Sequence, residues 1–419
     1  MFTKYLLIIG DGMADDPVPS LGNKTPLQTA PTPAIDRMAA RGVVGSVINC
    51  PSPLPAGSET AILSIFGCDP LRYFTGRSPM EAAAAGIAMA PGDAAFRCNL
   101  VALEDGDMPL AEKRVLSHSA GSIDGPSALE TVDVLLNDPR FARALKEARV
   151  ELHPFPAFRQ LAVQHDSDLS GIRFTPPHDH LGEPCGPLFP AGNDRAEVFA
   201  NLMALAPEIL DHHPVTEKRR AAGLLPANGI WFWAEGTAAA LPSFREQYGL
   251  EGAVVSAVPL CHGIGALRGL EMVEVEGATG ELDTNFEGKL EAAWAKLQQY
   301  DFVCLHLEAP DECTHNGDLP GKLQAIEWLD SRLTGPLVSR LEAAGLDHRV
   351  LLLSDHKTLT ATRGHDGDPV PFLLYDSRQD SGNGGVYDEA AGEQGPFVEN
   401  GCVLLDRLLD GKNDCSANQ

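Results

Sequence analysis

Long apolar runs are missing from this sequence of 419 residues. The apolar stretch nearest the N-terminus covers only Tyr5 to Ile9 before Gly10 and Asp11. A helix that spans a membrane needs about 20 apolar residues, and a secretory signal also has a longer apolar centre. The short run is therefore interpreted as a buried first strand.

Paired cysteine motifs are also missing. The nine cysteines are odd in number and scattered, and no CxxC occurs. Disulfide frameworks and zinc ribbons both need paired spacings. The cysteine pattern therefore predicts a reduced, cytoplasmic protein.

Positive charge is scarce. The chain has 32 Lys and Arg against 58 Asp and Glu, and its formal net charge is −26. Phosphate backbones and anionic membranes need a clustered basic face, so nucleic acid and membrane surfaces are excluded as expected partners. A small substrate is expected instead, and an anionic one must be met by metal ions or a few arginines. The oligomeric state is left open, a homo-oligomer included.

Nucleotide-binding loops are not found either. No GxxxxGK[ST] occurs, because Lys289 and Lys322 follow glycines but precede leucines. The segment HGIGALRG at 262–269 has Arg268 where the dinucleotide fingerprint requires a third glycine. Neither a phosphate loop nor a Rossmann site is therefore predicted.

Apolar runs of strand length alternate with helical patterns in the rest of the chain. The length suggests two or three domains. The runs YLLIIGDG (5–12), GAVVSAV (252–258), DFVCLHLEAPDE (301–312) and RVLLLSDH (349–356) are apolar on both faces, which is typical of central parallel strands. Patterns such as NFEGKLEAAWAKLQQY and PGKLQAIEWLDSRLTGPLVSRLEAAG lie between them. This alternation predicts a doubly wound α/β sheet whose site lies at the carboxyl ends of the strands.

The middle of the chain has a different composition. From about 93 to 239 it is rich in Pro, Gly, Asp and His, with shorter apolar segments. We interpret 93–239 as an inserted domain, and 1–92 with 240–419 as the core that it interrupts.

Acidic residues and histidines follow three of the predicted strands. Asp11 follows the first, Asp311 and His315 follow another, and Asp355 and His356 follow a third, with His365 shortly after. In a helical turn, Asp311 and His315 are spaced i and i+4 and share one face. Carboxylate and imidazole ligands suit manganese, zinc or magnesium, and the number of acids suggests two ions.

A serine supplies a candidate nucleophile. Ser58, in PSPLPAGSETAILSIFGCDP, precedes a helical pattern from Thr60 to Phe66. Such a serine is most often a simple N-cap, here with Ala61 at the third helical position. A serine among the free N–H groups of a helix N-terminus is also well placed to attack a phosphate when a metal ion activates it. Both interpretations stay open.

Two histidine-rich segments compete as metal sites. They are PPHDH, with His178 and His180, and DHH at 211–213. Adjacent residues rarely point the same way, and both segments lie beside prolines. A metal site is not expected in either.

Nearly the whole chain resembles the cofactor-independent phosphoglycerate mutases of the alkaline phosphatase superfamily, in their archaeal-type branch. The resemblance is carried by IIGDGMADDP, PAGSETAILSIFGCDP, YFTGRSPMEAAAAGI, FRCNLV, TPPHDH, NGIWFWAEG, GATGELDTNFEGK, YDFVCLHLEAPDECTHNGDLPGK and SDHKTLTATRGHDGDPVP. It implies an alkaline-phosphatase-like core with a smaller α+β insert that binds substrate.

The resemblance also implies two metal ions and their ligands. One ion would be held by Asp11, Ser58, Asp355 and His356, and the other by Asp311, His315 and His365. Manganese is expected first, with magnesium, zinc and cobalt as alternatives, and 2,3-bisphosphoglycerate is not required.

The implied reaction is the interconversion of 3- and 2-phosphoglycerate, an isomerisation in glycolysis and gluconeogenesis. Ser58 would take the phosphoryl group, glycerate would reorient without leaving, and the group would return to the other hydroxyl. The insert would close over the site and exclude water. Arg77, Arg97 and Arg159 are the candidates for binding the substrate.

The sequence departs from the family pattern at three places. They are FRQ at 158–160, His118 in LSHSAGSI, and Lys357 in SDHKT. The expected ligands are intact, so the departures bear on the substrate rather than on phosphoryl transfer. Relatives of this branch include probable homoserine kinases, and a homoserine kinase is the alternative function.

Overall fold

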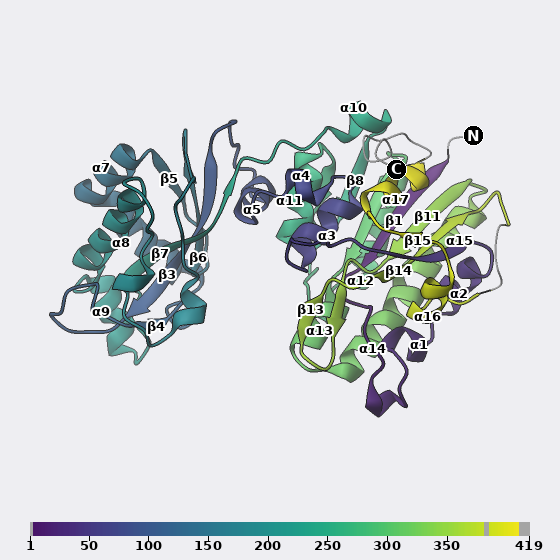
Figure 1. Cartoon of the computed structure of the whole chain (residues 1–419), viewed down its shortest axis with the longest axis horizontal. Helices are drawn as coiled ribbons and strands as arrows, with labels where there is room; N and C mark the ends of the chain where they lie inside the picture. The colour runs from purple at the N-terminus through teal and green to yellow at the C-terminus, as the bar shows by residue number, and fades with distance from the viewer. Residues whose placement is uncertain (1–2, 381–384, 410–419) are drawn as a thin grey trace. The chain divides into compact units, whose positions relative to one another are not determined.

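The computed structural model describes residues 3–380 and 385–409, which divide into two units (Figure 1). The first contains the described residues up to Phe74, Ala83–Ala85 and those from Ala240 onward. The second contains Thr75–Ala82 and Gly86–Ala239. The predicted insert, 93–239, differs from the second unit in its start, because residues 75–82 and 86–92 belong with that unit.

The first unit is built on an eight-stranded sheet of order β15-β2-β14-β11-β1-β10-β8-β9. Its strands are β1 (Lys4–Gly10), β2 (Val43–Val47), β8 (Gly252–Val255), β9 (Glu271–Val273), β10 (Phe302–Leu307), β11 (His348–Leu353), β14 (Val370–Asp376) and β15 (Phe397–Val398). The central strands β11, β1, β10 and β8 run parallel, and β14 is antiparallel to both of its neighbours. The doubly wound α/β prediction is confirmed, and the four apolar runs that predicted strands form β1, β8, β10 and β11.

Helices of the first unit follow the strands. They are α1 (Pro26–Thr29), α2 (Pro33–Ala39), α3 (Ser58–Ile65), α4 (Pro70–Tyr73), α10 (Phe244–Tyr248), α11 (Pro259–Leu267), α12 (Phe286–Leu297), α13 (Ala309–His315), α14 (Leu319–Trp328), α15 (Gly335–Ala343), α16 (Glu389–Gln394) and α17 (Cys402–Leu409). Short 3-10 and π segments are η1 (Pro19–Leu21) and η4 (Leu329–Thr334), and a two-stranded ribbon is formed by β12 (Lys357–Leu359) and β13 (Gly364–Asp366). Local sequence explains the helix ends: the side chains of Asn285 and Asp318 cap α12 and α14, and Gly345, at φ 65°, follows α15.

The second unit is α+β. Its sheet has the order β4-β3-β6-β5, with β7 also paired to β3, and every pairing is antiparallel. The strands are β3 (Ala94–Leu103), β4 (Val115–Ser117), β5 (Val150–His153), β6 (Arg159–Gln164) and β7 (Gly229–Thr237). The helices are α5 (Ser78–Ala84), which begins in this unit, α6 (Gly125–Asn137), α7 (Pro139–Ala148), α8 (Ala196–Leu210) and α9 (Pro214–Ala221), with 3-10 turns η2 (Pro177–His180) and η3 (Gly186–Leu188). Its core packs Phe96, Phe199 and Phe232 together.

The sequence also predicted reduced cysteines and no membrane-spanning segment. Seven cysteines of the described residues have free thiols, and all seven are buried: 50, 68, 98, 185, 261, 304 and 313. Cys402 is disulfide-bonded, so the prediction of a wholly reduced chain is wrong at that residue. Among the described residues, the helices are too short or too polar to cross a membrane.

Candidate metal centre and nucleophile

Three neighbouring parallel strands bring the predicted acids and histidines to one edge of the first unit's sheet. Asp11 follows β1, Asp355 and His356 follow β11, and α13 begins two residues after β10. Because β11, β1 and β10 are adjacent in the sheet and point the same way, their carboxyl ends meet. The sequence-based expectation that these residues lie together agrees with this geometry.

One cluster is formed by Asp311, His315 and His365. Asp311 and His315 lie on one face of α13, with His315 Nε2 at 3.1 Å from Asp311 Oδ2. His365, on β13, places its Nε2 at 3.5 Å from Asp311 Oδ1 and at 2.9 Å from His315 Nε2. The three ligand atoms, one from each residue, lie within 4.8 Å of one another, as the ligands of one ion must.

A second cluster surrounds Asp11. His356 Nε2 lies 3.7 Å from Asp11 Oδ1 and 3.1 Å from Asp355 Oδ2. Asp355 Oδ1 accepts hydrogen bonds from the backbone N–H groups of Gly12 and His356, at 3.0 and 2.8 Å. Asp311 also belongs here, since it offers a carboxylate oxygen within 4.8 Å of ligand atoms of Asp11 and His356. The two clusters therefore adjoin through Asp311.

Ser58 is the first residue of α3 and faces the second cluster. Its Oγ lies 3.2 Å from His356 Nε2 and 3.5 Å from Asp11 Oδ2. The N-cap of α3 is Gly57, and the cap makes no side-chain hydrogen bond. The N-cap interpretation of Ser58 is therefore wrong, because the hydroxyl group is directed toward the acids and the histidine.

Gly12, which follows Asp11 at the end of β1, is also required by the geometry of the site. Its φ is +61°, which side chains with a Cβ rarely adopt. A Cβ at this position would also lie 2.6 Å from Asp311 Oδ1. The glycine lets the backbone after Asp11 pass close to the carboxylate of Asp311.

A buried ion pair between Lys322 and Asp15 lies next to the two clusters. Lys322 Nζ lies 2.9 Å from Asp15 Oδ2 and donates to the carbonyl oxygen of Thr358 at 2.7 Å. The Thr358 hydroxyl in turn donates to Asp311 Oδ1 at 2.5 Å. This network fixes β12 beside α13, and thereby the orientation of the Asp311 carboxylate.

Burial and neighbouring charge shift the pKa values of the site. Burial, with the carboxylates of Asp355 and Asp311 nearby, raises the pKa of Asp11 well above its usual value. Burial would also raise the pKa of Asp311, but contacts with His315 and His365 outweigh it and the pKa falls. The hydrogen bond with Asp311 raises the pKa of His315 to about 9. The pKa of His365 also rises, because its contacts with Asp311 outweigh its burial.

His306 is a site residue that the sequence analysis missed. It lies inside β10, is fully buried, and places Nε2 at 3.1 Å from Asp11 Oδ2. Burial lowers its pKa to about 3, so the ring is neutral at neutral pH. A histidine within an apolar strand forms no recognisable sequence motif. The acids and histidines expected from the sequence all follow a predicted strand, whereas His306 lies inside β10.

The donor atoms fit divalent metal ions. Oδ1 of Asp11 and Oδ2 of Asp355 are buried and accept no hydrogen bond within residues 3–380 and 385–409. Buried carboxylate oxygens without a donor are costly unless a cation meets them. Together with the imidazoles of His315, His356 and His365, they form an oxygen and nitrogen set suited to manganese, zinc or cobalt.

Three predicted arginines of the second unit lie around one carboxylate. Glu81 accepts from Arg97 Nε at 2.9 Å and from Arg77 Nε at 3.3 Å. The charge of Arg159 acts on Glu81 as well. Arg159 Nε is buried and has no hydrogen-bond partner in the part of the chain that is described. Burial and then the charge of Arg97 lower the pKa of Arg159 to about 10.

Aromatic rings adjoin these arginines. The Arg97 guanidinium lies 4.9 Å from the ring centre of Trp233, which lies 5.0 Å from the ring of His178. The ring centres of His178 and His118 are 5.9 Å apart. The ring centres of His118 and Phe158, the neighbour of Arg159, are also 5.9 Å apart. Burial and the charges of His178 and Arg159 lower the pKa of His118. His178 thus belongs to a ring cluster, and no metal-ligand group involves it among the described residues.

Two of the three departures from the family pattern are explained by local contacts. Lys357 Nζ pairs with Asp16 at 2.8 Å. The Gln160 side chain accepts from the Phe155 N–H group at 2.6 Å and donates to the Ala157 carbonyl oxygen at 2.5 Å. Lys357 thus pairs with an exposed carboxylate, and Gln160 holds two backbone groups of the preceding loop.

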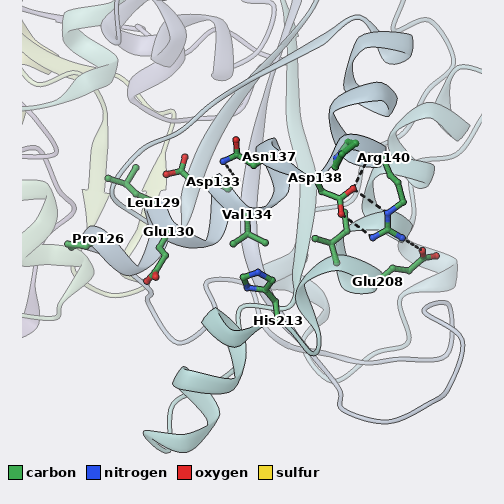
Figure 2. Close-up of a pocket in the computed structure, with 12 residues that line it drawn as sticks. Pro126, Leu129, Glu130, Asp133, Val134, Asn137, Asp138, Arg140, Glu208 and His213 are labelled. Carbon is green, nitrogen blue, oxygen red and sulfur yellow. Dashed lines mark hydrogen bonds and ion pairs between the residues drawn. The ribbon is translucent and has the colours of Figure 1, made fainter.

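A hollow of about 810 Å³ lies elsewhere in the second unit, against α6, α7 and α8 (Figure 2). Glu130 and Asp133 contribute acidic side chains to it, and Arg140 pairs with both Asp138 and Glu208. None of the predicted site residues lines this hollow, and metal-ligand groups occur only in the first unit among the described residues. The candidate reactive groups therefore lie at the strand ends of the first unit.

Comparison with known proteins first defines the class. Residues 3–408 match the Metalloenzyme superfamily. The match spans both units and includes all the clustered carboxylates and imidazoles. The chain is thus a metalloenzyme-superfamily protein, in agreement with the donor set described above.

The family follows from more similar proteins. The chain is 42% identical to a 2,3-bisphosphoglycerate-independent phosphoglycerate mutase of Methanosarcina acetivorans, over 97% of this chain and 98% of that protein. It is 40% identical to a probable enzyme of the same name from Geobacter sulfurreducens, over 97% of this chain and all of that protein. The solved structure of the cofactor-independent phosphoglycerate mutase from Thermoplasma acidophilum is 26% identical, with a TM-score of 0.67 over 97% of this chain and 99% of that one. A solved structure from Pyrococcus horikoshii is 28% identical, with a TM-score of 0.80 over 99% of both chains. The chain belongs to the 2,3-bisphosphoglycerate-independent phosphoglycerate mutase family, and the resemblance inferred from its motifs is confirmed.

Metal binding should release protons. His315 has a pKa of about 9 in the metal-free protein and is therefore protonated at pH 7.5, whereas a metal ion binds the neutral ring. We expect about one proton or more to be released when the cluster of Asp311 is filled, and the metal affinity to fall as the pH is lowered. Titration calorimetry with Mn²⁺ in buffers of different ionisation enthalpy measures this number. Equal heats in all buffers at pH 7.5 would contradict the expectation.

Proposed function

We propose that this protein interconverts 3-phosphoglycerate and 2-phosphoglycerate through a phosphoserine on Ser58, with neither ATP nor 2,3-bisphosphoglycerate as a co-reactant. The observation that carries the proposal is the position of the Ser58 hydroxyl group. It begins a helix and lies 3.2 Å from His356 and 3.5 Å from Asp11, beside buried oxygens that accept no hydrogen bond from the described residues. The name shared by the relatives described above supports the substrate.

The ligand sets are proposed as the sequence suggested them. Asp11, Ser58, Asp355 and His356 would hold one ion, and Asp311, His315 and His365 the other. The nearness of Asp311 to both clusters supports two ions side by side. Manganese is the proposed metal, with magnesium, zinc and cobalt as alternatives. Bound there, the ions would supply positive charge to the transferring phosphoryl group and favour the ionised serine.

The chain's own groups have separate tasks in this reaction. Ser58 Oγ gives up its proton and attacks phosphorus, the bond from phosphorus to the 3-oxygen of the substrate breaks as the phosphoserine forms, and that oxygen takes up a proton to become a hydroxyl group of glycerate. Ser58 stands at the N-terminus of α3, where the positive end of the helix dipole favours the negatively charged phosphoryl oxygens. The 2-hydroxyl group of the glycerate then attacks the phosphoserine and gives up its proton, and Ser58 Oγ leaves phosphorus and takes up a proton, which restores the serine.

The second unit is proposed to bind the substrate anion. Arg77, Arg97 and Arg159 carry three positive charges, and Glu81 supplies one negative charge among them. The excess charge and the unsatisfied Nε of Arg159 support binding of a carboxylate or phosphate group. His118, whose pKa is lowered by burial and by the charges of His178 and Arg159, and His178 add two polar rings beside these cations.

Substitution of Arg159 tests this part. We expect Arg159→Ala to lower kcat/KM at least tenfold, which corresponds to about 1.4 kcal/mol and to the lower limit for one charge-assisted contact. Arg149→Ala is the matched control, because Arg149 is exposed in the same unit and pairs only with surface Asp166 in the described structure. Steady-state rates at varied 3-phosphoglycerate give both constants. Unchanged kinetics of a folded Arg159→Ala variant would remove Arg159 from the substrate site.

The alternative, a homoserine kinase, is less well supported. A kinase needs a nucleotide site, and the sequence carries no phosphate loop or dinucleotide fingerprint. Homoserine carries an ammonium group, whereas three arginines favour an anion. The relatives reported above are named mutases.

A paired assay separates the two functions. Purified, Mn²⁺-loaded protein is supplied either with 3-phosphoglycerate alone or with homoserine and ATP, and products are followed by phosphorus NMR. We expect 2-phosphoglycerate in the first mixture and no phosphohomoserine in the second. Phosphohomoserine without mutase activity would overturn the proposal.

A further inference from the structure

A chain of hydrogen bonds crosses three neighbouring strands beneath Asp11. Ser256 follows β8, His306 lies in β10 and Asp11 follows β1. Ser256 Oγ lies 2.9 Å from His306 Nδ1, and His306 Nε2 lies 3.1 Å from Asp11 Oδ2. All three residues are at most 1% exposed, so water does not compete for these contacts.

Backbone geometry determines the direction of this chain. The N–H group of Val258 donates to Ser256 Oγ at 3.0 Å, so that oxygen already accepts one hydrogen bond. The serine hydrogen is then free to point at His306 Nδ1, which leaves Nε2 protonated and donating to Asp11. In the opposite tautomer, an Nε2 lone pair would face a carboxylate oxygen, and the buried serine hydrogen would have no acceptor among the described residues. Both are costly in a dry interior.

The same contacts divide the two oxygens of Asp11. His306 contacts Oδ2, which also lies 3.5 Å from Ser58 Oγ, whereas Oδ1 accepts no hydrogen bond within the described residues. Oδ1 is also the oxygen that lies 3.7 Å from His356 Nε2. The ring thus fixes the plane of the carboxylate and leaves one oxygen directed at the candidate metal position.

We propose that His306 and Ser256 are positioning residues that orient Asp11 for metal binding by fixing its Oδ2. The inference rests on the proposed role of Asp11 as a ligand. His306 itself does not coordinate the ion, because both of its ring nitrogens are engaged by Ser256 and Asp11. Donors of this kind contribute roughly tenfold to a hundredfold in metal affinity.

Two amide substitutions provide a matched test. In His306→Gln the side-chain NH2 group can reach the place of Nε2 and donate to Asp11, whereas in His306→Asn it reaches only the place of Nδ1. Binding of Mn²⁺ to the whole protein is measured by calorimetry, and paramagnetic resonance distinguishes a coupled ion pair from a single ion. We expect His306→Asn to bind one of two ions at least about tenfold more weakly, and His306→Gln to stay within about threefold of the parent.

Two further variants, Ser256→Ala and His348→Asn, complete the comparison. Ser256→Ala should also weaken one ion, by about threefold or more. His348→Asn is the control, since His348 is a buried histidine at the opposite end of β11 whose Nδ1 contacts the Leu346 carbonyl oxygen. It should bind both ions as the parent does.

Each outcome decides the inference. Two ions bound with parental affinity by His306→Asn, or equal weakening in the Gln and Asn variants, would overturn it while leaving the proposed function intact. If these variants do not fold, nitrogen NMR of histidine-labelled parent protein decides: a hydrogen on Nε2 of His306 supports the inference, and a hydrogen on Nδ1 overturns it. A parent protein that binds no Mn²⁺ would overturn the proposed metal site and this inference together.

Discussion

Replacing Ser58 with alanine should lower mutase activity by at least about a thousandfold, the equivalent of about 4 kcal/mol in transition-state stabilisation. The reason is that Ser58 Oγ is the atom proposed to carry the phosphoryl group between the two hydroxyl positions of the substrate. Without it, no covalent intermediate forms and the bound glycerate has no phosphate to receive. Turnover of 3-phosphoglycerate by the Mn²⁺-loaded variant measures the effect.

A second serine on the same helix supplies the control. Ser64 is fully buried in α3, and its Oγ has no hydrogen-bond partner in the described chain. Ser64→Ala removes the same atom without touching the clusters, so activity should remain near that of the parent. Both variants should keep the parental thermal midpoint. A Ser58→Ala variant with more than a few per cent of parental activity would contradict the phosphoserine mechanism.

Removal of divalent metal should have an effect of similar size. Asp11, Asp311 and Asp355 bring three carboxylates together in a largely buried site, and without cations nothing in the first unit's clusters balances the charge of an incoming phosphoryl group except the histidines. Metal ions contribute several kcal/mol to such transition states, so we expect about a thousandfold loss on chelation. Added Mn²⁺ should restore the activity.

The assay must not depend on metal itself. Coupling enzymes that use divalent ions would stop on chelation, so phosphorus NMR of 3- and 2-phosphoglycerate is the suitable measurement. Circular dichroism should show the sheet intact, because its central strands are held by the buried residues Leu6–Ile9 and Val350–Leu353 rather than by the clusters. Full activity of a protein shown to be free of metal would contradict the two-ion account.

The sequence predicted the strand ends of the site because short apolar runs and the residues after them are local features. Asp11 and Asp355 each follow a run that is apolar on both faces, and parallel neighbours bring such ends to one edge. The i and i+4 spacing of Asp311 and His315 was equally local, and α13 contains both. Ser58 was found as a helix-start residue, but the direction of its hydroxyl group depends on Asp11 and His356, which are distant in sequence.

Features that depend on contacts between distant segments were not predicted. His306 resembles any other residue of a buried strand until β1 and β8 are placed on either side of β10. The sequence-based boundaries leave residues 75–82 with the core, yet Glu81 pairs with Arg97 and Ser78 donates to the Ala234 carbonyl oxygen at 2.5 Å, and this segment belongs with the second unit. The antiparallel course of β14 also follows from its partners rather than from its own residues.

The most direct measurement is the identity of the residue that carries phosphate during turnover. Mn²⁺-loaded protein is mixed with 3-phosphoglycerate, quenched with acid within the first turnovers, digested, and analysed by mass spectrometry. The account predicts one added phosphoryl group on the peptide that contains Ser58, at Ser58 itself, with none on the same peptide of Ser58→Ala. Continued production of 2-phosphoglycerate with the phosphate on a different residue, or with unmodified Ser58 at every quench time, would contradict it.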